Sequence, residues 1–536
     1  MADRVKLMEK QSMPQSPLHA TALDLSSRSH HSMLEKGSDN VIDDNEEDYF
    51  DDVRESQGQR DLVPGRYSFI DALGIVCGII IGSGIFSSPG LALKRAGSPG
   101  LCLIAWAFAG GLVILTATCY MELGLMMPDA GGDFEYLRRA YGERASFAFA
   151  WFNFWISKTG SQAIIVTIFG RYVESILGDR VNMGTMYGGG ETVFSKLVAV
   201  TCLVVITILN CVSVRESTML QNILTACKLG LVVTLFIAAI VFVSNPSTSS
   251  YAEATLEQNL SVHHSMEGSN GVFAFGNALV ACLWSFDGWA DLNFMMEELK
   301  YPLSLPKIVA TALVIVTCAY ILCNIAYMML LDQESMTSTK AIGTDFGIAM
   351  ARGDPYAFWP IFIACGVALS TVGSAHGSCM TGGRAFYAVA RGGKAPAFLA
   401  KLNKLGSPYG ALLAQGGWGV VLLLLPGSSF SSLLDYFGPA SWGFYTLGSI
   451  SVILLRYKEP DTPRPFRIPL YPLPPVLVIL IALSIIVSSL MSNPLYVLLA
   501  FSFCGLSIPC HMALFEEEST LYMLLSKLRK PRNGFV

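Results

Sequence analysis

In GIIIGSGIFSSPG, residues 78–90, glycines, serines and a proline interrupt an apolar run long enough to cross a bilayer. In hydrocarbon every backbone N–H and C=O needs a partner, so a loosened helix is tolerated only where protein encloses it or where it lines a cavity. Small residues also let neighbouring helices approach closely, which is the alternative explanation for such glycines. We interpret Gly82, Ser83 and Gly84 as a break in a membrane-spanning helix and as part of a ligand site.

The composition is that of a multi-pass membrane protein. The 536 residues are 52% hydrophobic and 14% charged, against about 25% charged residues in an ordinary soluble domain. A helix needs about 20 residues to cross roughly 30 Å of hydrocarbon. We predict twelve spans, at about residues 68–92, 100–127, 146–173, 197–214, 220–243, 271–299, 308–331, 357–389, 410–426, 431–456, 472–490 and 495–515.

The residues outside the spans predict the organisation and orientation of the chain. Residues 1–66 are polar and acidic, with DDNEEDYFDDVRE at 43–55, and predict a disordered tail before a twelve-helix membrane domain at 67–515 and a second tail at 516–536. The start, MADRVKLMEK, lacks an apolar signal-peptide core, so the first span is expected to target the chain. Lys and Arg are concentrated in alternate loops, which favours cytoplasmic N- and C-termini, and we expect the plasma membrane.

Cysteines and histidines exclude some other classes of protein. All 13 cysteines fall within predicted spans, so no disulfide framework is expected. The seven histidines form no HExxH motif and no Cys/His cluster, so we expect no metal, no cofactor and no enzymatic activity. A glycosylation sequon at Asn259 lies in the predicted outward loop 244–270 and agrees with the orientation.

A second interruption, WSFDGW at residues 284–289, lies within the sixth predicted span. Paired interruptions in corresponding spans of two repeats point to the binding site of a transporter, whereas a channel would need a ring of repeated selectivity loops. The N-terminal end of a half-helix suits a carboxylate, and the carbonyls at a C-terminal end suit an ammonium. The pair of breaks therefore predicts a pocket for an α-amino acid, built from Ile80, Ile81, Gly82, Ser83, Gly84, Trp284, Ser285, Phe286, Asp287 and Gly288.

Several motifs, in order along the chain, resemble those of a known family. They are GIIIGSGIFSSPG followed by AGSPG at 96–100, AGGDFEY at 130–136, DGWADLNFMMEEL at 287–299 and GRAFYAVARGGKAP at 383–396. Together they resemble the L-type branch of the amino acid, polyamine and organocation (APC) superfamily. The resemblance implies an all-α integral membrane protein of LeuT-like fold, with twelve transmembrane helices, a 5+5 inverted repeat and broken helices one and six. It also implies sodium-independent exchange of L-amino acids.

The same resemblance assigns roles to single residues. The substrate carboxylate is expected at the backbone N–H groups of Ser83 and Gly84, and the amino group at carbonyls near Ile80, Ile81 and Trp284. Trp284 is expected to close over the ligand as an aromatic gate. Alternatively, it is one of the tryptophans that gather at the membrane interface.

Asp287 and Lys228 are the most informative charges within the spans. A carboxylate in the middle of a span is functional by default, and the cystine and dibasic amino acid exchangers resemble this chain in having both the tryptophan and the aspartate. Asp287 could attract the distal cation of a substrate, or it could bind loosened backbone or a lysine and leave the substrate neutral. Lys228 matches a lysine that can replace a sodium ion, but it could also titrate or be purely structural. Lys158 is expected to snorkel or to pair internally.

The sequence leaves partners and some alternatives open. Heavy-chain-linked relatives resemble one another in a cysteine after the third span, and the loop at 174–191 has none. A disulfide-linked heavy chain is therefore not expected, while a noncovalent partner remains open. A polyamine transporter and a non-transporting amino acid receptor are the alternative functions, and proton coupling is the alternative to exchange.

Overall fold

The computed structural model describes residues 65–129, 131–177, 184, 191–245, 255, 257, 259, 272–339, 341–425 and 430–516. Side chains are not described at 272–274, 430–435 and 437. These residues belong to one compact unit, residues 61–536. The predicted N-terminal tail at 1–66 and C-terminal tail at 516–536 lie almost entirely outside the described residues.

The described part of the chain is helical, and its one β-bridge joins Tyr67 to Leu299. The α-helices are α3 (Phe69–Ile80), α4 (Ser88–Ala96), α5 (Pro99–Met126), α6 (Asp133–Tyr141), α7 (Glu143–Phe152), α8 (Lys158–Leu177), α9 (Val193–Val212), α10 (Val214–Ser244), α12 (Val272–Ser285), α13 (Leu305–Leu330), α14 (Gln333–Ser338), α15 (Ile342–Met350), α16 (Phe358–Arg391), α17 (Tyr409–Leu424), α18 (Phe430–Lys458), α19 (Leu473–Ser492), α20 (Pro494–Gly505) and α21 (Ser507–Phe515). Short 3₁₀ helices are η1 (Gly84–Phe86), η4 (Asp291–Glu298), η5 (Pro302–Ser304) and η6 (Ala397–Ala400), and η2 (Asn153–Ser157) is a turn of π-helix.

Eight helical segments of the described residues are long and apolar enough to cross a membrane. They coincide with eight of the predicted spans. The other four predicted spans fall on α7 with η2 and α8, on α12 with η4, on α17, and on α18. The chain is thus an all-helical membrane protein, whereas the number of twelve crossings stays a prediction.

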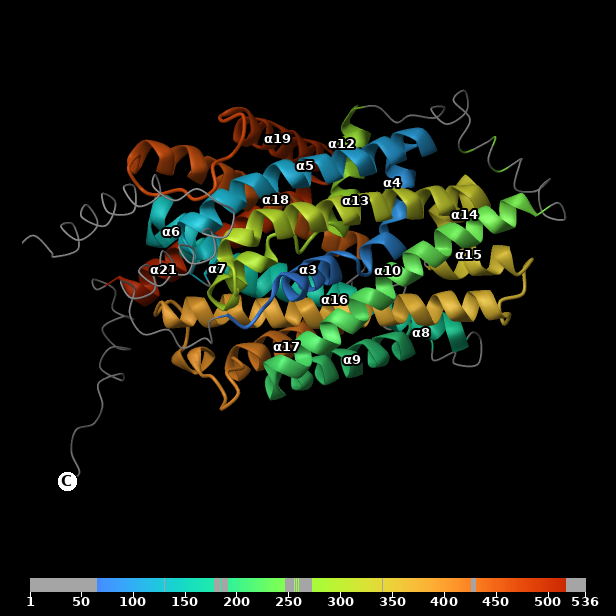
Figure 1. The fold of residues 1–536 in the computed structure, drawn as a ribbon, viewed down its shortest axis with the longest axis horizontal. Helices are drawn as coiled ribbons and strands as arrows, with labels where there is room; N and C mark the ends of the chain where they lie inside the picture. Colours follow the sequence, from blue (N-terminus) through green and yellow to red (C-terminus); the bar gives the residue numbers. More distant parts are fainter. Residues whose placement is uncertain are drawn as a thin grey trace, which may run out of the picture. The chain divides into compact units, whose positions relative to one another are not determined.

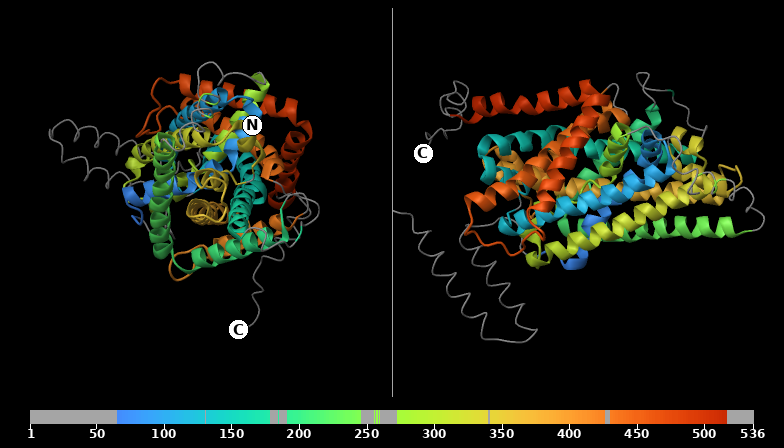
Figure 2. Two further views of the ribbon diagram at one scale, coloured as in Figure 1. Left: turned by 90° about the vertical axis from the view of Figure 1, so that its right-hand side faces the viewer. Right: turned by 90° about the horizontal axis from the view of Figure 1, so that it is seen from above.

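The helices pack into a bundle around α16. Figure 1 shows α5, α13 and α10 running side by side, with α6 and α7 at one end of the bundle and α14 and α15 at the opposite end. In the end-on view of Figure 2, α16 (gold) lies inside the surrounding helices. Its residues 370–390 are buried except for Val372. This burial reflects contacts of α16 with α3, α8, α9, α10 and α17.

The first break lies where the sequence analysis places it. Helix α3 begins with a capping box between Ser68 and Asp71 and ends at Ile80. Residues 81–83 are not helical, η1 follows, and α4 begins at Ser88 with a proline in its first turn. The helix therefore stops and restarts within one predicted span.

The second break is also observed. Helix α12 ends at Ser285, five residues form turns, and η4 begins at Asp291. Gly288 has a φ of +102° in this turn, a conformation that strongly favours glycine because it lacks a Cβ atom. Both interruptions are therefore formed by the small residues that suggested them.

A buried ion pair fixes the far end of η4. Glu298 and Arg384 of α16 form an ion pair in which both side chains are at most 2% exposed. Arg384 also donates to the hydroxyl of Tyr67 at 2.7 Å, and the Tyr67 N–H donates to the Glu298 carbonyl at 3.0 Å. The chain just before α3 and the end of η4 are thus held to the central helix.

The side chain of Asn259 is not on the surface. It is 1% exposed, and its amide nitrogen donates to the carbonyls of Met328 and Leu331 at 3.0 and 2.9 Å. A glycosylation acceptor must be accessible, so this conformation does not support the sequon as a sign of orientation.

Candidate functional site

The two breaks lie against each other. A Cβ atom placed on Gly84 would come within 2.6 Å of the Ser285 Cα atom, so the two backbones are in contact. The hydroxyl of Tyr320, on α13, lies 2.6 Å from the Ile80 carbonyl and 2.7 Å from the Ser285 carbonyl. This one hydroxyl therefore ties the end of α3 to the end of α12.

A narrow cavity of about 20 Å³ lies between the breaks. It has room for about one water molecule and is far smaller than the roughly 300 to 1,000 Å³ of small-molecule sites, so in this conformation it is too small for an amino acid. The cavity is lined by residues of the two breaks and of α8 and α16: Ile79, Ile80, Gly82, Ser83, Gly84, Lys158, Ser161, Ile165, Trp284, Ser285, Asp287, Gly288, Asp291, Ser374 and Ser378.

The structure brings most of the predicted site residues to this cavity. Two of the ten predicted residues, Ile81 and Phe286, do not line it. Phe286 packs instead against Tyr320 and Trp106, with ring centroids 4.9 and 6.3 Å away. A backbone that turns sharply directs successive side chains to different sides, so consecutive residues do not all line one cavity.

The first break presents unpaired backbone donors. Among the described residues, the N–H groups of Gly82, Ser83 and Gly84 have no hydrogen-bond acceptor. The three residues are buried and line the cavity. Buried N–H groups are rarely left without a partner, and such a group at a helix end is suited to an anion. The arrangement can hold a carboxylate.

The carbonyls near the breaks already accept hydrogen bonds from the protein. The Ile80 carbonyl accepts from Tyr320, and the Ile81 carbonyl accepts from the hydroxyls of Ser374 and Ser370 at 3.3 and 3.4 Å. The Trp284 carbonyl accepts from the Asp287 N–H at 3.0 Å. A carbonyl oxygen has two lone pairs, so some acceptor capacity for an ammonium group remains.

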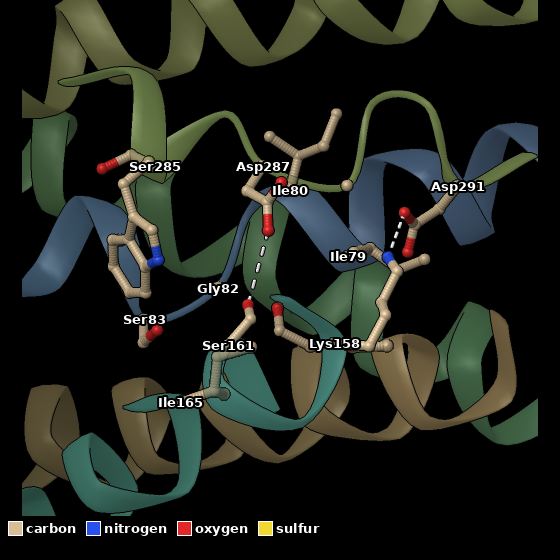
Figure 3. A pocket seen from close by; sticks show the side chains of 15 residues that line it. Ile79, Ile80, Gly82, Ser83, Lys158, Ser161, Ile165, Ser285, Asp287 and Asp291 are labelled. Atoms are coloured by element: carbon tan, nitrogen blue, oxygen red, sulfur yellow. Dashed lines mark hydrogen bonds and ion pairs between the residues drawn. The ribbon is translucent and has the colours of Figure 1, made fainter. Parts of the chain in front are cut away.

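Two carboxylates and one ammonium line the cavity, and they are held differently. Lys158 forms an ion pair with Asp291, and the second oxygen of Asp291 accepts from the Thr381 hydroxyl at 2.6 Å. Asp287 accepts from the hydroxyls of Ser161 and Tyr445 at 3.4 Å each and interacts with the backbone N–H of Gly288. Figure 3 shows Lys158 directed toward Asp291 and Ser161 toward Asp287.

Burial matches this difference. Lys158 and Asp291 are 6% and 3% exposed, whereas Asp287 is partly exposed. Of the two acids, Asp287 is therefore the one more accessible from the cavity.

Lys228 lies beside the first break but does not line the cavity. Its ammonium donates to the Gly78 carbonyl and, at 3.0 Å, to the Ser374 hydroxyl. The same Ser374 hydroxyl donates to the Gly78 carbonyl at 2.9 Å. Lys228 thus bonds the carbonyl of Gly78, close to the end of α3, outside the cavity.

Sequence reasoning missed Tyr320, Asp291 and the serines contributed by α8 and α16. Asp291 lies four residues after Asp287 in a motif that carried the family resemblance, so a second acid near the break was visible. Its pairing with Lys158 was not, because 133 residues separate the two. Tyr320 had no local signal, since it lies in the middle of an ordinary apolar helix.

Comparisons with known proteins identify the family of the chain. Residues 67–506 match the model of the family described as amino acid permease. The chain is 33% identical over 430 residues to the b(0,+)-type amino acid transporter 1 of Mus musculus, which covers 79% of this chain and 82% of that protein. It is 34% identical over 427 residues to the large neutral amino acids transporter small subunit 2 of Homo sapiens, covering 79% and 76%. The chain therefore belongs to the amino acid permease family of the APC superfamily, and it is a multi-pass membrane transporter of amino acids and not an enzyme.

Proposed function

We propose that this protein is a sodium-independent exchanger of L-amino acids with neutral or cationic side chains, working by alternating access. The observation that carries the proposal is that the two breaks contact each other beside a cavity. The cavity is lined by Gly82, Ser83 and Gly84, whose N–H groups have no acceptor among the described residues. A LeuT-like fold with twelve spans and two inverted repeats belongs to the same proposal, as do the L-type branch, the plasma membrane and cytoplasmic termini.

The substrate's common part is expected to bind to the backbone. The N–H groups of Gly82, Ser83 and Gly84 suit the α-carboxylate, and the carbonyls of Ile80 and Trp284 suit the α-ammonium. Main-chain groups contact only the part that all α-amino acids share. The side chain of the substrate must then be selected by other groups around the cavity.

Asp287 is the group that we propose faces the substrate's side chain. It is partly exposed and weakly held, so it can accept a hydrogen bond or balance a cation. One relative carries the symbol (0,+) in its name, and the name of the other refers to large neutral amino acids. Asp287 is the residue by which we expect this chain to accept a cationic as well as a neutral side chain.

Sodium independence is supported by Lys228. Its ammonium occupies the space between the Gly78 carbonyl and the Ser374 hydroxyl, oxygen groups of the kind that coordinate a small cation. A second monovalent cation beside it would be repelled, by about 4 kcal/mol at 4 Å for an effective dielectric constant of 20.

The substrate is the partner that the proposal names, and a noncovalent protein partner is compatible with it. The sequence at 174–191 has no cysteine, so a heavy chain linked by a disulfide at this loop is not part of the proposal. A noncovalent partner would be found by purification of the full chain from its native membrane under mild detergent.

Counterflow in proteoliposomes tests the proposed exchange. Purified full-length protein is reconstituted, the vesicles are loaded with unlabelled leucine, and uptake of labelled leucine or arginine is followed. Preloading should accelerate the uptake, and vesicles without protein are the control. Binding of an amino acid without any flux would reject transport in favour of a receptor.

Polyamine transport is the second candidate, because Asp287 could hold an amine that lacks a carboxylate. The unpaired N–H groups at the first break favour a ligand with a carboxylate. Putrescine should therefore compete poorly with labelled arginine. Competition by putrescine as strong as that by unlabelled arginine would favour the polyamine alternative.

A further inference from the structure

A salt bridge between Lys158 and Asp291 lies in the wall of the cavity. Lys158 is the first residue of α8 and follows directly on the π-helical turn η2. Asp291 is the first residue of η4, directly after the second break. Both line the cavity together with Asp287, so all three charges can act on a bound substrate.

The environment of Lys158 identifies Asp291 as its counterion. The ammonium contacts an Asp291 oxygen and lies 5.6 Å from the ring centroid of Phe294. Asp133 and Asp287 also interact electrostatically with Lys158, but the Asp133 carboxylate accepts from Tyr120 at 2.5 Å and Asp287 accepts from the hydroxyls of Ser161 and Tyr445. Asp291 is thus the acid in direct contact with the lysine.

The sum of these charges leaves one carboxylate in excess. Because Lys158 and Asp291 balance each other, the described lining of the cavity has a net charge of −1, carried by Asp287. A charge in a poorly solvated site interacts strongly with a ligand charge. A cationic side chain would supply the missing positive charge, whereas an anionic one would add to the excess.

We propose that the Lys158–Asp291 ion pair determines which side-chain charge this pocket accepts, by cancelling the lysine so that Asp287 selects cationic and neutral amino acids against anionic ones. The inference rests on the proposed function and deepens it. The proposal makes Asp291 a specificity-determining residue, although its carboxylate is already bonded to Lys158 and Thr381. It also predicts that the preference changes when either member of the pair is neutralised, and in opposite directions.

The test measures the binding of arginine, leucine and glutamate to the purified full chain by ligand-induced shifts of the melting temperature, and then their uptake. The wild type should bind glutamate at least about tenfold more weakly than arginine. Asp291→Asn, which leaves the ammonium without a counterion, should lower the arginine-to-leucine affinity ratio by about tenfold and raise glutamate binding. Lys158→Gln should raise the arginine-to-leucine ratio.

Two further variants complete the design. The double variant Lys158→Gln/Asp291→Asn removes both charges and should restore the wild-type order of affinities. Thr381→Ala removes a hydrogen bond to Asp291 but no charge, and it should leave the order unchanged. If Asp291→Asn cannot be purified, Lys158→Gln and the double variant still decide the matter.

Three results would overturn the inference: equal affinity of the wild type for glutamate and arginine, an unchanged order in Lys158→Gln, or a double variant that does not return to the wild-type order. Binding reports on the ion pair whether or not the protein carries flux. Absence of leucine counterflow would reject the proposed exchange alone, so the two failures can be told apart.

Discussion

The two interruptions of the membrane helices differ in the chemistry they bring to the cavity. The first, around Gly82 and Gly84, contributes backbone N–H groups and no ionisable side chain. The second contributes two carboxylates, Asp287 and Asp291, one of them paired with a lysine of α8. The comparison suggests that the two breaks have different roles: the first binds the α-carboxylate and α-ammonium that all amino acids share, and the second distinguishes their side chains by charge.

The largest expected effect comes from filling the contact between the breaks. A Cβ atom at Gly84 would lie 2.6 Å from the Ser285 Cα atom, and a backbone atom cannot move aside without displacing the second break. Gly84→Ala should therefore reduce uptake of arginine and leucine alike, by about 100-fold, as expected for a displacement of about 1 Å in a binding site. The measurement is initial uptake normalised to protein in the vesicles.

Gly160→Ala is the matched control for this variant. Gly160 lies on α8, two residues from Lys158, and a Cβ atom there would meet nothing within 4 Å. Its uptake should equal that of the wild type. A Gly84→Ala protein with normal uptake would contradict the idea that the close approach of the two backbones is required.

Charge selection at the second break is tested by Asp287→Asn. The substitution keeps the shape and removes the charge that is weakly held by Ser161 and Tyr445. Arginine uptake should fall by about tenfold relative to leucine uptake, because a cationic side chain loses its counter-charge and a neutral one does not. Equal losses for the two substrates would contradict a role of Asp287 in charge selection. They would show that Asp287 serves to maintain the structure.

Tyr320 links the two breaks. Removing its hydroxyl should lower the uptake of all substrates to a similar extent, and less than Asp287→Asn lowers arginine uptake. Tyr320→Phe removes the hydroxyl that lies near the Ile80 and Ser285 carbonyls. We expect uptake of arginine and leucine to fall by about fivefold each, which corresponds to roughly 1 kcal/mol, the size of one net hydrogen bond.

Tyr327→Phe serves as the control, since Tyr327 lies on the same helix and is buried, but its hydroxyl contacts no carbonyl among the described residues. A change in the ratio of arginine to leucine uptake in Tyr320→Phe would show that Tyr320 acts on selectivity and not on the shared part of the site.

The sequence predicts the two breaks better than the side chains that other helices bring to them. Gly-Ser-Gly and Asp-Gly act through their own backbone, so a local pattern is sufficient to place both interruptions. Tyr320 and the Lys158–Asp291 pair depend on how α8, α13 and the second break pack, and no local pattern contains that information. The packing of Phe286 against Tyr320 and Trp106 has no local signal for a related reason, since a turn changes which side each residue faces.

The smallest expected effect concerns the coupling ion. The Lys228 ammonium, at the back of the first break, bonds the Gly78 carbonyl and the Ser374 hydroxyl, and a sodium ion at the same oxygens would meet a like charge. Replacing sodium by choline should therefore leave the initial uptake of leucine and arginine unchanged, in the wild type and in Asp287→Asn alike. If uptake by the wild type falls in choline and recovers when sodium is returned, the lysine does not take the place of the ion. The first break would then bind a cation as well as a carboxylate, and the different roles assigned to the two breaks would have to be revised.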